Sequence, residues 1–161
     1  KKATLTGKAN IINGIVYNPI TDEIYWAEKG FGAYLNERKI RVSGREKLNG
    51  CLFSTGYFWK VEDAKSEIVE LVKNITSKHA TIRCGGSAAL DLAYVAAGRY
   101  DGFWHYDLKS WDIAAGILLV QEAKGIFSEL STKSGLLNSG NIVATNGHIH
   151  EQLEKVLLNY K

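Results

Sequence analysis

Residues 111–123 read Trp-Asp-Ile-Ala-Ala-Gly-Ile-Leu-Leu-Val-Gln-Glu-Ala, and this stretch decides the fold. After Asp112 it is apolar on nearly every face of a helix, a pattern typical of a helix that is buried on all sides. Glycine inside a helix costs about 1 kcal/mol relative to alanine. Gly116 therefore predicts that another segment packs closely against this helix.

Asp112 lies in the first turn of the same predicted helix. A carboxylate is costly to bury unless it is paired or binds a metal. A helix N-terminus, however, offers it backbone N–H donors and the positive end of the helix dipole. Two interpretations follow from the residues alone: Asp112 belongs to a functional site, or it caps the helix and has no chemical role.

A second feature lies upstream, where residues 80–83 read as a strand and residues 84–87 (Cys-Gly-Gly-Ser) as a turn. A helix is predicted over residues 88–97, closed by Gly98. A glycine turn between a strand and a helix leaves backbone N–H groups free to bind an anion, and glycine lets a ligand approach the backbone. The alternative is an ordinary tight turn, because the phosphate-loop and dinucleotide-binding patterns are absent.

The rest of the chain divides into two parts. Residues 1–45 alternate as antiparallel hairpins, and we interpret them as the remnant of an antiparallel sheet domain. Residues 46–161 alternate strands with helices, which predicts a C-terminal α/β domain with a mixed sheet covered by helices on both faces. The expected hairpin strands are 3–6 and 11–17 (joined at Gly7-Lys8), 24–27, 33–35 and 39–40. The expected later elements are strands 51–55, 101–105, 126–128 and 141–145 and helices 62–74 and 149–159. Five aromatic residues fit a half-buried sheet face, namely Tyr17, Tyr25, Trp26, Phe31 and Tyr34.

Composition narrows the function classes. The chain has 161 residues and a net charge of +3, without the clustered basic face that nucleic-acid binding requires. Its two cysteines cannot form a disulfide framework and predict reduced thiols in a cytoplasmic protein, with Cys84 a small buried residue. We expect no signal peptide, and no apolar run reaches the roughly 20 residues that span a bilayer. Because the chain starts at Lys1 and contains no methionine, we expect a processed or excised piece.

Two histidines near the C-terminus suggest a metal site at first sight. His148 and His150 are two residues apart, however, and such residues do not share a face of a helix. No third ligand is in view, so we interpret them as a solvated helix start.

Taken together, these segments closely resemble the inositol monophosphatase family, and the resemblance extends over essentially the whole chain. The segments that carry it are Gly85-Gly86-Ser87-Ala88-Ala89-Leu90-Asp91, continuing to Trp104, then Trp111-Asp112-Ile113-Ala114-Ala115-Gly116 and Glu122-Ala123-Lys124-Gly125. Near the start, Gly14-Ile15-Val16-Tyr17-Asn18-Pro19 and residues 28–36 resemble the central hairpin region of the family.

The resemblance implies a Mg²⁺-dependent phosphomonoesterase acting on inositol monophosphate or a related sugar or polyol phosphate. It implies that Asp112 binds metal and that Gly86, Ser87 and Ala88 contact the substrate ring, whereas Trp111 is a packing residue. The glutamate and the Asp-Pro-Ile/Leu-Asp-Gly-Thr loop that supply most metal ligands of the family are missing here. We therefore expect this chain to be inactive or nearly so by itself.

One departure from the family pattern concerns substrate choice. Seven residues before the metal-binding aspartate, many inositol monophosphatases carry a glutamate that binds the inositol hydroxyls, and this chain has His105. A neutral imidazole both donates and accepts a hydrogen bond, whereas a carboxylate only accepts. His105 is therefore either a substrate-binding residue with altered hydroxyl recognition or a surface histidine at a strand end.

The alternatives are a histidinol-phosphate, fructose-1,6-bisphosphate or 3′-phosphoadenosine 5′-phosphate phosphatase, or a non-catalytic association module. The resemblance also implies a homodimer, whereas the composition and charge pattern predict that the chain binds neither membrane nor nucleic acid directly.

Overall fold

A small antiparallel sheet opens the structure, a computed structural model that describes residues 10–56, 65–130 and 135–158. Its four strands follow one another in chain order, β1 (Asn13–Asn18), β2 (Glu23–Glu28), β3 (Gly32–Leu35) and β4 (Arg38–Ile40). The strands expected at 33–35 and 39–40 pair with each other, with Ala33 opposite Ile40, but β4 already begins at Arg38, which pairs with Leu35. The predicted strand 3–6 lies outside the described residues.

The second sheet has five strands and mixed directions. Its members are β5 (Leu52–Thr55), β6 (Thr81–Arg83), β7 (Gly102–His105), β8 (Ile126–Glu129) and β9 (Ile142–Thr145), in the order β6-β5-β7-β9-β8. β5 runs parallel to both β6 and β7, whereas β9 is antiparallel to β7 and β8. The predicted mixed sheet is confirmed, while the domain boundary at residue 45 stays a prediction.

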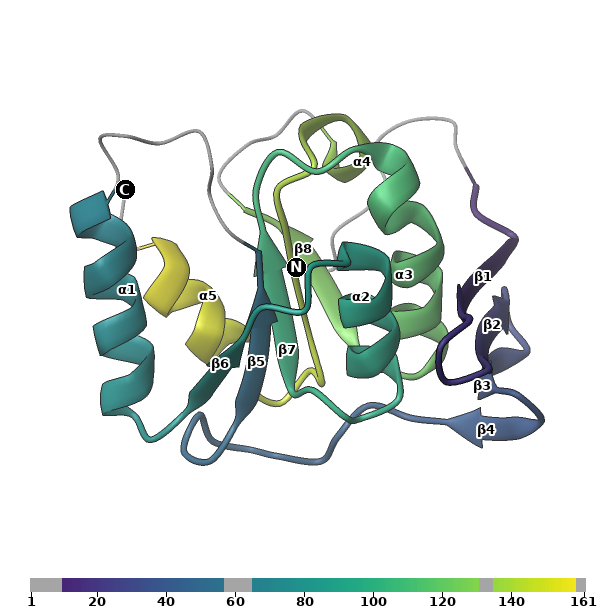
Figure 1. The fold of residues 1–161 in the computed structure, drawn as a ribbon, viewed down its shortest axis with the longest axis horizontal. Helices are drawn as coiled ribbons and strands as arrows, with labels where there is room; N and C mark the ends of the chain where they lie inside the picture. The colour runs from purple at the N-terminus through teal and green to yellow at the C-terminus, as the bar shows by residue number, and fades with distance from the viewer. Residues whose placement is uncertain (1–9, 57–64, 131–134, 159–161) are drawn as a thin grey trace.

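The helices cover both faces of this five-stranded sheet and produce a layered molecule (Figure 1). α1 (Lys65–Ser77) and α5 (His150–Leu158) lie on one face. α2 (Ala88–Ala96) and α3 (Ser110–Glu122) lie on the other and separate the two sheets. The short helix α4 (Leu136–Ser139) was not predicted. No helix of the described segments is long and apolar enough to cross a membrane.

α3 lies at the centre of these layers, as its sequence predicts. It packs against α2 on one side and against β1 and β2 on the other, and most of its residues from Ile113 onward are buried. A Cβ atom at Gly116 would lie 2.5 Å from the Cβ of Leu92 in α2, so the close approach predicted from Gly116 is confirmed. The first sheet also packs closely against α3, because a Cβ at Gly14 would lie 3.1 Å from the Cα of Ala115.

Three local predictions need correction. The helix predicted to end at residue 74 continues to Ser77 before the chain turns at His79, whose φ of 58° lies outside the helical region. Phe31 is exposed in the turn between β2 and β3 rather than on the sheet face. His150 does not belong to a solvated helix start, because it is 7% exposed and hydrogen-bonds Thr145 and Ser128, while His148 is exposed as predicted.

Candidate functional site

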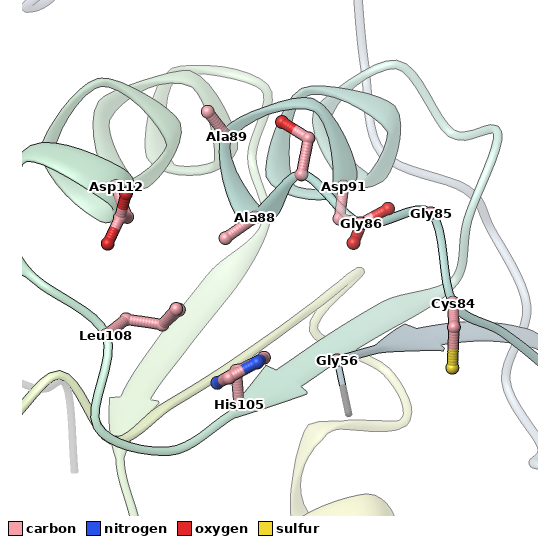
Figure 2. A pocket seen from close by; sticks show the side chains of 11 residues that line it. Gly56, Cys84, Gly85, Gly86, Ala88, Ala89, Asp91, His105, Leu108 and Asp112 are labelled. Atoms are coloured by element: carbon pink, nitrogen blue, oxygen red, sulfur yellow. The ribbon is translucent and has the colours of Figure 1, made fainter. Parts of the chain in front are cut away.

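A cavity of about 620 Å³ opens where strands β5, β6 and β7 end and helices α2 and α3 begin. In Figure 2 the side chains of Asp91 from α2, Asp112 from α3 and His105 from β7 point toward the same space. The described lining residues are Gly56, Cys84, Gly85, Gly86, Ser87, Ala88, Ala89, Asp91, His105, Leu108 and Asp112. The cavity therefore brings together the two sequence features, 84–88 and 112, that local patterns singled out.

Sheet topology explains why the cavity lies at this edge. The connection from β5 to β6 carries α1 on one face, and the connection from β6 to β7 carries α2 on the other face. The two connections therefore diverge at the carboxyl end of β5. In open α/β sheets such a point leaves a crevice in which ligands bind.

Asp112 caps its helix and also lines the cavity, so its capping role does not exclude a role in a functional site. Its Oδ2 accepts a hydrogen bond of 2.9 Å from the backbone N–H of Lys109, which caps the first turn of α3. The same carboxylate lines the cavity and points into it (Figure 2). Capping consumes one acceptor position and leaves carboxylate lone pairs on the side of the cavity.

The glycine turn forms the opposite rim. Gly86 has a φ of +81°, a conformation that favours glycine, and Ser87 begins α2 as its N-cap. The Ser87 hydroxyl accepts a long hydrogen bond of 3.4 Å from the Leu90 N–H. Gly86, Ser87 and Ala88 all line the cavity, and the N-terminus of α2 directs its positive dipole end toward it.

His105 ends β7 and lines the same cavity. Its Nδ1 lies 2.6 Å from the carbonyl oxygen of Tyr106, which fixes the ring orientation. A Cβ at Gly56 would lie 2.0 Å from its Nε2, so the ring packs directly over the backbone at the end of β5.

Two residues near the cavity differ from their predictions. Trp111 is 79% exposed rather than packed. Cys84 is exposed rather than buried. Partial desolvation, together with the nearby Asp91, raises the pKa of the Cys84 thiol, which is the opposite of what an activated thiolate nucleophile requires.

Sequence reasoning missed Asp91 as a lining residue of the cavity. It is 3% exposed, and burial raises its pKa to about 6. The Ser54 hydroxyl lies beside the carboxylate and acts on its pKa in the opposite direction, lowering it, although the pair does not reach standard hydrogen-bond geometry. The available signal was the same as for Asp112, an acidic residue in the first turn of an apolar helix.

The charge of the site matters for its ligand. The described lining contains two carboxylates, Asp91 and Asp112, and neither lysine nor arginine. A phosphate ester would be repelled there unless a cation stood between the negative groups. Carboxylate oxygens are ligands that Mg²⁺ prefers, so Asp112 fits a magnesium ion. Within the described segments, no three His, Cys, Asp or Glu side chains converge on one metal position.

These features define a layered α/β protein with an acidic cavity at two helix N-termini. Residues 4–160 match the inositol monophosphatase family. The chain belongs to this family.

Similar proteins fall into two groups by name. The chain is 43% identical over 153 residues to a putative Nus factor SuhB of Neisseria meningitidis, covering 95% of this chain and 59% of that protein. It is 42% identical to an inositol-1-monophosphatase of Rhizobium meliloti, covering 95% and 58%. The crystal structure of the extragenic suppressor protein suhB from Bartonella henselae superimposes with a TM-score of 0.83 at 43% identity, covering 91% and 56%. The chain thus spans less than two thirds of the relatives that it matches.

Proposed function

We propose that the complete protein is a Mg²⁺-dependent phosphomonoesterase that hydrolyses a polyol or sugar monophosphate, with inositol monophosphate as the first candidate. One observation carries the proposal: Asp112 and the glycine turn 85–88 face a single cavity at two helix N-termini. Relatives named inositol-1-monophosphatase, such as that of Rhizobium meliloti, support this activity.

In this proposal the chain's residues divide the work between metal and substrate. Asp112 would hold a Mg²⁺ ion, which when bound supplies Lewis-acid activation of water and neutralises charge on the leaving oxygen. Gly86, Ser87 and Ala88 would contact the hydroxylated ring and orient the ester for attack. The N-terminal dipoles of α2 and α3 would favour the negative phosphate.

The remaining metal ligands would come from outside residues 1–161. The chain covers 59% and 58% of the two relatives above, and one proposed ligand does not make a multi-metal centre. We therefore propose that residues 1–161 alone have no appreciable phosphatase activity. Mg²⁺-dependent hydrolysis of inositol monophosphate by the isolated chain would contradict this.

The direct test replaces Asp112 by asparagine in the complete gene product. Asparagine keeps an oxygen that can accept the Lys109 N–H, so the helix cap is retained while the charge that attracts Mg²⁺ is lost. We expect kcat to fall by about 100-fold or more, with an unchanged melting temperature. The matched control is Asp107→Asn, which changes an acidic residue that does not line the cavity. Equal activity in the two variants would refute the role of Asp112.

His105 tests which substrate the site prefers. We expect His105→Glu to raise kcat/KM for inositol 1-phosphate by about tenfold relative to histidinol phosphate, because a carboxylate accepts hydrogen bonds from ring hydroxyls. The measurement is the ratio of the two kcat/KM values in parent and variant. A ratio that does not change would remove His105 from substrate recognition.

A second candidate function is association with another macromolecule, and the relative named putative Nus factor SuhB favours it. In this alternative, Asp112→Asn abolishes hydrolysis but leaves protein partners bound in a pull-down. The proposed homodimer is checked independently by light scattering after size exclusion.

A further inference from the structure

The loop 106–109 connects two residues of the candidate site. It begins after His105, the last residue of β7, and ends at Lys109, the residue before α3. The Lys109 N–H donates to Asp112 Oδ2 at 2.9 Å, so the position of Lys109 determines how the Asp112 carboxylate is turned toward the cavity. Leu108 lines the same cavity, and in Figure 2 it lies between His105 and Asp112. A shift of this loop would therefore move the proposed metal ligand.

The backbone of this loop is stabilised from outside, by the segment that joins α4 to β9. Asp107 has a φ of 55°, in the left-handed region, which is unfavourable for residues other than glycine and persists where neighbouring groups stabilise it. Asn141 provides such a contact, because its Oδ1 accepts a hydrogen bond of 2.9 Å from the Asp107 N–H. Asn141 is itself fixed, since its carbonyl oxygen accepts a hydrogen bond of 2.8 Å from the Leu130 N–H.

Gly140 supports the next residue of the loop. The Leu108 N–H donates to the Gly140 carbonyl oxygen at 3.2 Å. The two backbones are in direct contact, because a Cβ at Gly140 would lie 1.8 Å from the Leu108 carbonyl oxygen. Gly140 is the C-cap of α4 and has a φ of +66°, which favours glycine. Because α4 packs against α3 (Figure 1), it places Gly140 relative to the helix that carries Asp112.

We propose that Gly140 and Asn141 are positioning residues for the proposed metal site. They hold the loop 106–109 in place, and the loop in turn keeps the Asp112 carboxylate in the orientation that binds the cation. This inference rests on the proposed function and adds to it two residues that do not line the cavity themselves. Removing a group that orients a metal ligand from outside the coordination sphere typically lowers metal affinity by about 10- to 100-fold.

The test compares Asn141→Ala with Asn141→Asp in the complete gene product. Alanine removes the acceptor of the Asp107 N–H, whereas aspartate keeps an oxygen at the same place. Mn²⁺ serves as the probe for the divalent cation, and its Kd is measured by electron paramagnetic resonance of the free ion. Hydrogen exchange of the backbone amides of residues 107–109 and the melting temperature are measured on the same samples.

We expect Asn141→Ala to raise the Kd of Mn²⁺ about tenfold. The amides of residues 107–109 should exchange about tenfold faster, because the loop opens more often. Asn141→Asp should keep both values within about twofold of the parent, since the acceptor is retained. The matched control is Asn49→Ala, at an exposed position between β4 and β5, which should change neither value.

An unchanged Kd of Mn²⁺ in Asn141→Ala would overturn the positioning role, even with a lower melting temperature, because a merely structural residue behaves in this way. An Asn141→Asp variant as defective as Asn141→Ala would also overturn it, since the hydrogen-bond acceptor is then not what matters. If Asn141→Ala does not fold, Asn141→Ser decides by the same measurements, because the serine hydroxyl is too short to replace the amide oxygen.

The same data separate this inference from the proposed function. A parent that binds no Mn²⁺ refutes the proposed function and the positioning role together. A parent that binds Mn²⁺, with an Asn141→Ala variant of equal affinity, refutes only the positioning role.

Discussion

Asp101 is a buried carboxylate that joins segments far apart in the sequence. It is 4% exposed and accepts hydrogen bonds from Ser43 Oγ at 2.5 Å and from the Leu52 N–H at 2.7 Å. Arg45 Nε lies 3.3 Å from the same carboxylate and balances its charge. Asp101, the residue before β7, thus connects the segment between the two sheets with the start of β5.

We expect Asp101→Ala to lower the free energy of unfolding by about 2–4 kcal/mol, because the Leu52 N–H and the Ser43 hydroxyl lose their acceptor. Urea unfolding of the complete gene product measures this change. Glu37→Ala, at an exposed position between β3 and β4, is the control and should stay within about 0.5 kcal/mol. Equal stability of the two variants would show that Asp101 is not a structural link.

At the scale of elements, the contact between α2 and α3 determines where both helix N-termini lie. Gly116 permits this contact, because a Cβ there would lie 2.5 Å from both Cβ and Cδ1 of Leu92. Leu92 is fully buried and has little room to move away. The distance between the two sides of the cavity therefore depends on the absence of a side chain at Gly116, in the middle of α3.

Gly116→Ala separates helix propensity from packing. Alanine favours an isolated helix by about 1 kcal/mol, yet we expect a net destabilisation of about 1–3 kcal/mol, because α2 and α3 must move apart. Chemical denaturation measures the change. A matched substitution at an exposed position of the same helix, Gln121→Ala, should be neutral or slightly stabilising. A stabilised Gly116→Ala variant would mean that the helix pair is not tightly packed.

At the scale of the whole molecule, Arg99 connects the first sheet to the helix layer. Its guanidinium forms an ion pair with Glu23 of β2 and donates to the Tyr25 hydroxyl at 2.7 Å. It also lies over the rings of Tyr25 and Tyr94, with 5.2 Å from its Cζ to the centroid of Tyr94. The Arg99 hydrogen bond lowers the pKa of Glu23 to about 2.

We expect Arg99→Ala to destabilise the fold by about 1–3 kcal/mol at pH 7. Because the pKa of Glu23 is lower in the folded state than its ordinary 4.5, the ion pair contributes fully above pH 4.5. Its contribution is lost as the pH falls toward 2. The difference between parent and variant should therefore shrink over that range in unfolding experiments.

The control for Arg99 is Lys39→Ala, which removes an exposed cation over the ring of Tyr34. This change should cost less than about 1 kcal/mol at pH 7. A difference between parent and Arg99→Ala that stays constant from pH 7 to pH 3 would mean that Glu23 is not the partner that matters.

The sequence by itself determined most of the helices and strands, though not α4 or the end of α1, together with the mixed α/β class and the two motifs that face the cavity. These features depend on neighbouring residues: the apolar run after Asp112, the first-turn carboxylate and the glycines at 85 and 86. The family resemblance implied that Asp112 binds metal and that residues 86–88 contact the substrate, and the structure added that both line one cavity. The sequence did not determine the strand order β6-β5-β7-β9-β8, because strand pairing depends on contacts between distant segments.

Only the tertiary structure decided which side chains are buried. It buried His150 and exposed Trp111 and Cys84, against the predictions made for them, and it buried Asp91, for which no prediction was made. The physical reason is that exposure depends on which segment packs over a residue, and that segment lies elsewhere in the chain. Local chemistry thus identified the two sides of the cavity, and packing decided which further residues line it.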